Sequence, residues 1–267
     1  MINIEIINTE DKLDEFRNLY FNSIPEPQEL FLELLINPYK ELDTKPPKKY
    51  LIKIKETDIG YCIVNSEDII LEFYLIDNYI PICEDIFKLV LTKLSISKAF
   101  CKSFDSVFLK CCITYHKILK LEGILFRDMI EKDVEKPHPN LKFRIGESED
   151  FSQISLFKEG FFENNGELKV YLDNKRLFCF LINDEIIGCG IFSRIIKNRP
   201  DFDIGMVVHP KYRRKGFGTY IINHLKNFCL ENNWRPICGC GIENIGSRHT
   251  LEKAGFVSKH NLLEFQF

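Results

Sequence analysis

The chain has 267 residues, of which 45% are hydrophobic, and its formal net charge is −3 at pH 7. Because single domains usually run to about 100–150 residues, this length predicts two domains. A chain without a basic excess has no electrostatic support for binding nucleic-acid phosphates or acidic membranes, so we expect neither as a partner.

The amino-terminal segment, MINIEIINTEDKLDEF, is rich in charged residues and has no apolar run long enough for a signal peptide or a membrane helix. We therefore expect a cytoplasmic protein. Most of the ten cysteines stand singly in apolar stretches, as buried thiols do. The pairs Cys111-Cys112 and Cys238-Gly239-Cys240 lack the spacing of a zinc site, so we expect no metal.

Helical and β-rich patterns alternate in the first half of the chain. Apolar spacing predicts helices from Leu13 to Tyr20 and from Leu30 to Leu35, and strands over Tyr50 to Ile54 and Ile59 to Val64. A polar stretch with two prolines then covers Glu131 to Asn140, where no helix can continue. We place a linker at 137–140, between halves at 1–136 and 141–267.

The second half repeats this pattern. A helical pattern from Phe151 to Phe161 precedes predicted strands over Leu177 to Ile182 and Ile186 to Phe192. Gly60 matches Gly188 at an offset of 128 residues, and Gly123 matches Gly255 at an offset of 132. LEFYL of the first half also parallels DIGMVV of the second. These offsets indicate an internal duplication, so we expect two α/β halves in tandem.

A glycine-bearing basic loop distinguishes the second half. It follows the predicted strand Asp203 to Val208 and opens a helix with Phe217, Ile221, Leu225 and Phe228 on one face. Free backbone N–H groups at a helix N-terminus, aided by the helix dipole, bind anions. Glycines at 216 and 218 let a pyrophosphate approach the backbone, and three neighbouring cations add charge. The first half has neither glycine nor arginine at the corresponding place, so we expect that it has lost this loop.

Three motifs in this order resemble the GCN5-related N-acetyltransferases, or GNAT family: the strand, the RxxGxG loop and a later Asn244-x-x-Ser247 that leads into Lys253-x-Gly255-Phe256. The resemblance covers about residues 143–267. It implies an α/β fold with a mixed, mainly antiparallel sheet flanked by helices, and acetyl-CoA as co-substrate. It also suggests a tandem member whose first half is degenerate and either serves structurally or closes one wall of the acceptor pocket.

The resemblance assigns residues to the cofactor site by position. The Val208 N–H is implied as the donor to the thioester oxygen, and the amides from Arg214 to Thr219 as the pyrophosphate cradle. Asn244 matches a family asparagine that hydrogen-bonds pantetheine, although it also fits the first residue of a helix. The full cofactor set is Met206, Val207, Val208, Arg213, Arg214, Lys215, Gly216, Phe217, Gly218, Thr219 and Asn244.

The family's catalytic base and acid are only partly matched in this sequence. Asp203 stands where the family often has a carboxylate base, with Asp201 two residues earlier, and a strand-entry aspartate is the plain alternative. The family's acid is a tyrosine seven residues after the asparagine, and Leu251 occupies that position. Tyr212, His249 and Cys240 are the other candidate acids nearby in sequence. The thiolate can also leave without a proton donor.

We expect an N-acetyltransferase that moves an acetyl group from acetyl-CoA to a primary amine by direct attack. The acceptor is a small-molecule or peptide amine, and the protein is a monomer or a homodimer. The alternatives are a non-catalytic acyl-CoA-binding or regulatory protein, which Leu251 favours, and an acyltransferase for longer acyl groups.

Overall fold

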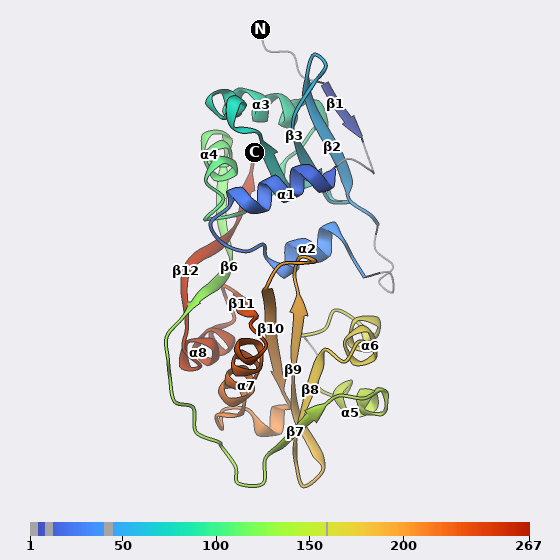
Figure 1. Cartoon of the computed structure of the whole chain (residues 1–267), viewed down its shortest axis with the longest axis vertical. Helices are drawn as coiled ribbons and strands as arrows, with labels where there is room; N and C mark the ends of the chain where they lie inside the picture. Colours follow the sequence, from blue (N-terminus) through green and yellow to red (C-terminus); the bar gives the residue numbers. More distant parts are fainter. Residues whose placement is uncertain (1–4, 9–12, 40–44, 159) are drawn as a thin grey trace. The chain divides into compact units, whose positions relative to one another are not determined.

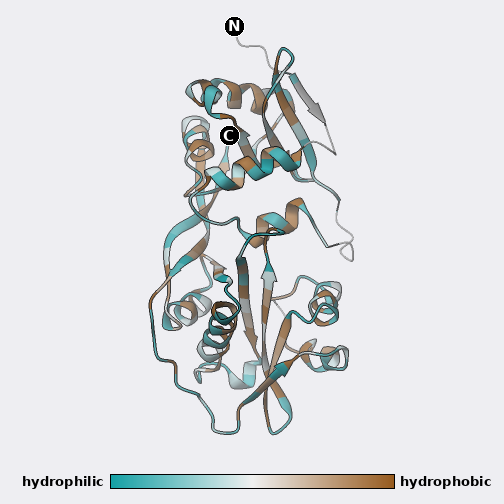
Figure 2. Cartoon of the chain, viewed as in Figure 1, coloured by the Kyte–Doolittle hydropathy of each residue, from teal (hydrophilic) through white to brown (hydrophobic). Residues whose placement is uncertain are grey.

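The computed structural model describes residues 5–8, 13–39, 45–158 and 160–267. They form two compact units (Figure 1). The described residues of Met1–Pro38, Thr44–Ile124 and His260–Phe267 make the first unit, and those of Tyr39–Asp43 and Leu125–Lys259 make the second. Figure 2 shows that strands and helices alike carry both hydrophobic and hydrophilic residues.

In the first unit the neighbouring strands run in the order β1-β2-β3-β4-β5-β12-β6. The strands up to β4 pair antiparallel, and β4 then pairs with β5 in parallel. The strand bounds are β1 (Glu5–Asn8), β2 (Lys48–Ile54), β3 (Thr57–Val64), β4 (Ile69–Leu75), β5 (Lys98–Lys102), β6 (Ile118–Met129) and β12 (Phe256–Gln266). The helices are α1 (Leu13–Ser23), α2 (Leu30–Ile36), α3 (Cys83–Leu94) and α4 (Ser106–Tyr115), with a 3-10 turn η1 (Asp77–Ile82).

The second unit repeats this topology in the order β12-β6-β11-β10-β9-β8-β7. The pairs β7–β8, β8–β9 and β9–β10 are antiparallel, and β10 pairs with β11 in parallel. The new strands are β7 (Lys142–Ile145), β8 (Leu177–Ile182), β9 (Glu185–Arg194), β10 (Asp201–Val208) and β11 (Arg235–Gly241). The helices are α5 (Phe151–Ile154), α6 (Asn165–Asp173), α7 (Phe217–Glu231) and α8 (Ile245–Lys253), with 3-10 turns η2 (Ser148–Asp150) and η3 (Pro210–Tyr212). The shared strand order confirms the predicted tandem of two mixed α/β halves.

Two strands carry residues of both units, so the units do not coincide with the predicted halves 1–136 and 141–267. The strand β6 continues past Ile124 into the second unit, and β12 ends in the first unit, where Leu262–Gln266 pair with β5. The polar stretch 131–140 is irregular, as predicted. It lies within the second unit, however, and the units divide at Ile124 and Lys259 instead.

Two details of the sequence interpretation were wrong. The helical pattern from Phe151 to Phe161 gives a helix of only four residues, α5, and Phe161 lies in a turn. Phe157 is nevertheless buried in the core that α5 and α6 form with β8 and β9. The match of Gly123 with Gly255 also fails, because Gly123 lies inside β6, whereas Gly255 follows α8 with φ +94. A backbone at this φ favours glycine and ends a helix.

A buried ion network ties the helices of the first unit to its sheet. Arg17 of α1 donates to both carboxylate oxygens of Glu72 on β4 at 3.0 and 2.8 Å, and to Glu33 of α2 at 2.7 Å. Gln28 and Tyr61 also donate to Glu72 at 2.6 and 2.9 Å. Glu72 has no exposed surface. Burial lowers the pKa of Arg17, but the charges of Glu72 and Glu33 outweigh burial and raise it overall.

Replacing Arg17 with alanine tests this network. Because the change leaves the Glu72 carboxylate buried without its cation, it should lower the free energy of unfolding by about 3–5 kcal/mol. Lys48→Ala is the control, since Lys48 pairs with Asp68 on the surface at 3.0 Å, where an ion pair contributes little. Urea unfolding followed by circular dichroism measures both. Equal effects of the two variants would contradict a stabilising role for the network.

Candidate acyl-transfer site

The strands β10 and β11 part soon after they begin to pair. Their parallel register covers only Asp201–Asp203 opposite Arg235–Ile237, whereas β9 pairs with β10 from Phe202 to Val208. Beyond Asp203, the side of β10 that faces away from β9 therefore has no strand partner among the described residues. A gap of this kind exposes backbone donors and acceptors to which an extended ligand can pair as an added strand does.

The register shows which backbone groups face this gap. At the end of the ladder the His209 N–H donates to the Ile187 carbonyl at 2.9 Å. Hydrogen-bonded pairs recur at every second residue of an antiparallel pair, so Val207 also directs its N–H and C=O to β9. Met206 and Val208 direct theirs to the opposite side. Of the three residues predicted to bind the cofactor through their backbone, Met206 and Val208 therefore face the gap. The Val207 backbone faces β9, so only its side chain could contact the cofactor.

One carbonyl at the gap is already bound. The Arg213 Nε donates to the Val208 carbonyl at 2.9 Å. This bond joins the end of β10 to the basic loop and uses the acceptor of Val208, so the role left to the Val208 backbone is that of a donor. Arg213 therefore shapes the gap in addition to carrying the positive charge for which the sequence singled it out.

The loop delivers an uncapped helix N-terminus. Gly216 precedes α7 with φ +85 and gives no side-chain cap. By contrast, α8 is capped by Asn244, whose Oδ1 accepts from the Ser247 N–H at 3.0 Å, and α6 by Asn164. The first N–H groups of α7, on Phe217, Gly218 and Thr219, are thus left for an anion. Arg214 and Lys215 are exposed beside them.

The two glycines of the loop serve different purposes. A Cβ on Gly216 would meet only the Pro137 Cβ, at 3.6 Å, so the space beside this backbone is open. A Cβ on Gly218 would lie 3.2 Å from the Thr250 methyl of α8 and 3.4 Å from the Met206 sulfur of β10. Gly218 therefore permits close packing of α7 on its neighbours, a role that the sequence analysis did not assign to it.

The other predicted site residues differ in their burial and in their hydrogen-bond partners. Phe217 is buried, so only its backbone N–H is available to a ligand. Because the Asn244 Oδ1 caps α8, a contact with pantetheine would have to come from its amide nitrogen, and that contact stays a prediction. Leu251 is 2% exposed and packs in the unit's interior. Of the candidate acids, Tyr212 donates to Glu185 at 2.6 Å and His249 is exposed.

The predicted base lies on the face of β10 opposite α7. A Cβ on Gly205 would meet the Phe161 ring at 3.1 Å, while Met206 faces α7. Since side chains alternate along a strand, Asp203 shares the face of Gly205. Its cross-strand neighbour is Ser193 of β9.

Comparison with known sequences agrees with this geometry. Residues 9–129 match the model of an acetyltransferase (GNAT) domain, and residues 142–256 match that of the acetyltransferase (GNAT) family. An uncharacterized N-acetyltransferase of Bacillus subtilis (strain 168), YjdG, is 30% identical over 125 residues, which are 45% of this chain and 70% of that protein. The chain belongs to the GNAT acetyltransferase family.

Solved structures extend the likeness to both halves of this GNAT chain. A GNAT-family acetyltransferase from Colwellia psychrerythraea superposes with a TM-score of 0.84 at 17% identity and covers 99% of both chains. A tandem GNAT protein from the clavulanic acid biosynthesis pathway gives a TM-score of 0.64 at 10% identity, over 99% of this chain and 98% of that one. At these identities the likeness concerns the fold, and the fold is a tandem GNAT fold.

The corresponding helix of the first GNAT half begins with acidic residues. Its helix α3 follows β4 through η1, and the first turn of α3 carries Glu84 and Asp85. These carboxylates favour the positive end of the helix dipole and would repel a pyrophosphate. No acidic residue stands in the first turn of α7.

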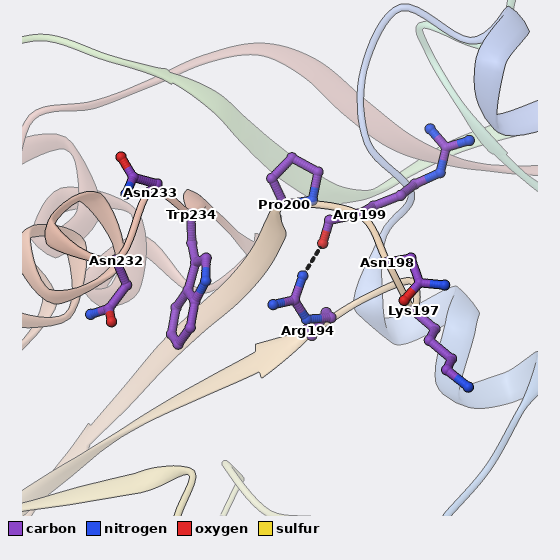
Figure 3. Close-up of a pocket in the computed structure, with 8 residues that line it drawn as sticks. All are labelled: Arg194, Lys197, Asn198, Arg199, Pro200, Asn232, Asn233 and Trp234. Carbon is purple, nitrogen blue, oxygen red and sulfur yellow. Dashed lines mark hydrogen bonds between the residues drawn. The ribbon is translucent and has the colours of Figure 1, made fainter.

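An open pocket of about 640 Å³ at the other end of β10 has a different character. It lies where β9 turns into β10, next to the end of α7 (Figure 3). Arg194 lies over the Phe202 ring, 4.5 Å from its centroid, and donates to the Arg199 carbonyl. The pocket lies at the opposite end of β10 from Val208, so it is not part of the acyl-transfer site.

The described residues hold neither a metal-binding cluster nor a membrane-spanning helix. None of their His, Cys, Asp and Glu side chains form a group that would hold a metal ion. None of their helices is long and apolar enough to cross a membrane.

Gly218→Val tests the packing role of this glycine. The added methyl groups would collide with Thr250 and Met206, so the free energy of unfolding should fall by about 1–3 kcal/mol. Gly246→Val is the matched control, because Gly246 is also the second residue of its helix and a Cβ there meets only the Asn244 Oδ1, at 3.9 Å. Chemical denaturation of both variants gives the comparison, and a destabilised Gly246→Val would undermine it.

Gly216→Val tests the phosphate loop. A β-branched side chain at φ +85 strains the turn and fills the space beside the N–H groups, so acetyl-CoA should bind at least about tenfold more weakly, or about 1.4 kcal/mol. Gly160→Val controls for the backbone strain, since Gly160 has φ +73 and open space around it. Isothermal titration of the full-length variants measures the affinity. An unchanged Kd in Gly216→Val would refute the loop assignment.

Proposed function

We propose that the chain is an acetyl-CoA-dependent N-acetyltransferase that acts on a primary amine by direct attack. The observation that carries the proposal is the gap in β10 beyond Asp203, with the backbone of Met206 and Val208 facing it and the uncapped α7 next to it. An extended amide-bearing ligand with a pyrophosphate group fits these donors and acceptors. Membership of the GNAT family supports the same donor substrate.

Acetyl-CoA would supply an acetyl thioester to the site. The chain's own contribution is to hold this donor through Met206, the Val208 N–H and the amides from Arg214 to Thr219. The Val208 N–H then donates to the oxygen on which negative charge grows during attack. The tie between Arg213 and the Val208 carbonyl keeps this donor in place.

Asp203 is the proposed general base. The amine nitrogen forms a bond to the acetyl carbon, the carbon–sulfur bond breaks, and the amine's proton passes to the carboxylate directly or through water. Asp203 lies on the face of the sheet toward Phe161, on the gap-bearing strand. Asp201 is on the same face, two residues farther from the gap, and burial raises its pKa.

The leaving thiolate has no assigned proton donor. Leu251 is buried, and Tyr212 is engaged with Glu185. A thiol has a pKa of about 8.5 in water, so its thiolate is a tolerable leaving group near neutral pH and solvent can protonate it afterwards.

The buried Leu251 also favours a second candidate, an acyl-CoA-binding protein without catalysis. Release of free thiol from acetyl-CoA, measured across a library of primary amines with the full-length protein, separates the two. Turnover with at least one amine supports the enzyme. Tight acetyl-CoA binding without turnover of any amine supports the binding protein, and the acyl chain length is tested with longer thioesters in the same assay.

Asp203→Asn should lower kcat/KM for the amine by about 10²–10⁴-fold, the usual contribution of a general base. The affinity for acetyl-CoA should stay within twofold, because the carboxylate lies off the backbone edge that binds it. Asp201→Asn, on the same strand and face, is the control and should retain most of the activity. A larger loss of kcat/KM in Asp201→Asn than in Asp203→Asn would show that Asp201, and not Asp203, is the base.

A further inference from the structure

A residue from the first half of the sequence lies beside the proposed base. Tyr39 precedes β2 in the chain, yet it groups with the second unit. Its hydroxyl oxygen is 3.3 Å from the Ser193 Oγ, and its ring packs edge-on against Tyr171 of α6 with centroids 6.2 Å apart. None of the predicted site residues lies in this part of the sequence.

The contacts of Tyr39 lead to Asp203. Ser193 is the residue opposite Asp203 in the β9–β10 register, and directly opposed side chains on one face of a sheet have Cβ atoms about 4.5–5.5 Å apart. A serine hydroxyl at this distance can reach the carboxylate. Ser193 is only 1% exposed, so its hydroxyl depends on protein partners such as Tyr39.

Charged and titratable groups surround this position. Tyr171 is 1% exposed, and burial is the main cause that raises its pKa. The charges of Tyr39, Glu167 and Asp203 raise this pKa further, as does a hydrogen bond with Tyr39. It therefore stays protonated at neutral pH. Burial also raises the pKa of Glu167 on α6. On α7, burial and then the charge of Asp203 raise the pKa of Cys229 to about 12. Asp201 and its neighbour Arg235 add two further charges on β10 and β11.

We propose that Tyr39 is a positioning residue of the acceptor site, which through Ser193 fixes the Asp203 carboxylate for the incoming amine. The inference rests on the proposed function and adds a specific residue to it. The hydroxyl of Ser193 can donate only one proton. A bond from the Tyr39 hydroxyl to the Ser193 oxygen leaves that proton for Asp203, and a hydrogen bond to an ionised carboxylate favours its charged form.

Tyr39→Phe tests the inference because it removes the hydroxyl and keeps the ring. In the full-length protein, with the amine that the library screen turns over fastest, kcat/KM for the amine should fall about three- to tenfold. The acid limb of its pH profile should move up by about 0.5–1 unit, the shift expected when Ser193, released from Tyr39, no longer donates its hydrogen bond to the ionised base. Binding of acetyl-CoA should not change.

Two further variants separate positioning from structure. Ser193→Ala should give the same shift, and the double variant should add little to either, because both residues act through one network. Tyr50→Phe removes the hydroxyl of another half-buried tyrosine, in the first unit, and should leave the profile unchanged.

The outcomes are distinct. If wild-type protein acetylates amines and Tyr39→Phe has the wild-type pH profile, the inference is wrong and the proposed function stands. Additive effects of Tyr39→Phe and Ser193→Ala, or an equal loss of acetyl-CoA affinity, would show a structural role and also overturn it. If wild-type protein acetylates no amine, the proposed function fails and the inference fails with it.

Discussion

The short parallel pairing between β10 and β11 is the constraint on which the second unit's chemistry depends. A strand in the middle of a sheet normally satisfies its backbone groups on both sides. In this chain β10 does so only as far as Asp203. Beyond that point half of its backbone donors and acceptors face the gap and not a neighbouring strand. The Arg213 side chain satisfies the one carbonyl nearest the loop. What is left is a row of directional groups that selects an extended polar ligand over a compact apolar one.

The two halves use the corresponding strand differently. In the first unit the fourth strand carries Glu72, and its carboxylate is saturated by Arg17, Gln28 and Tyr61. No acceptor capacity remains there for a substrate, and the network joins helices to the sheet instead. In the second unit the residue opposite Asp203 on the neighbouring strand is Ser193. The corresponding strands of the two halves therefore hold their carboxylates in different surroundings.

Much of the fold follows from local sequence patterns. The strands β2, β3, β4, β8, β9 and β10 and the helix α7 could be predicted because apolar periodicity decides them directly, as with Phe217, Ile221 and Leu225, which are all buried. The length of α5 could not, since turns after Ile154 bring Phe157 to the core without a helix. The exchange of β6 and β12 also left no local signal, because strand partners are set by tertiary contacts and not by propensity.

Only those parts of the candidate site that are contiguous in the sequence could be predicted. The glycine loop and its strand are contiguous, so a motif reveals them. Tyr39 lies more than 150 residues from Ser193, and no spacing rule joins residues so far apart. The orientation of the Val207 backbone and the packing of Gly218 could not be predicted for a related reason: which way a backbone group points, and what a missing Cβ makes room for, depend on register and packing.

The path of β12 has a consequence for biosynthesis. Leu262–Gln266 supply the strand next to β5, so the first unit lacks an inner strand until the residues of β12 have left the ribosome. Domains that are contiguous in sequence can fold one after the other during translation. Here the strand that pairs with β5 follows the residues of the second unit in the sequence, and until it is made the nascent chain holds an unpaired β5 edge. Such an edge is a site for pairing with other chains, so chaperone occupancy during synthesis should matter more to this protein than its size alone suggests.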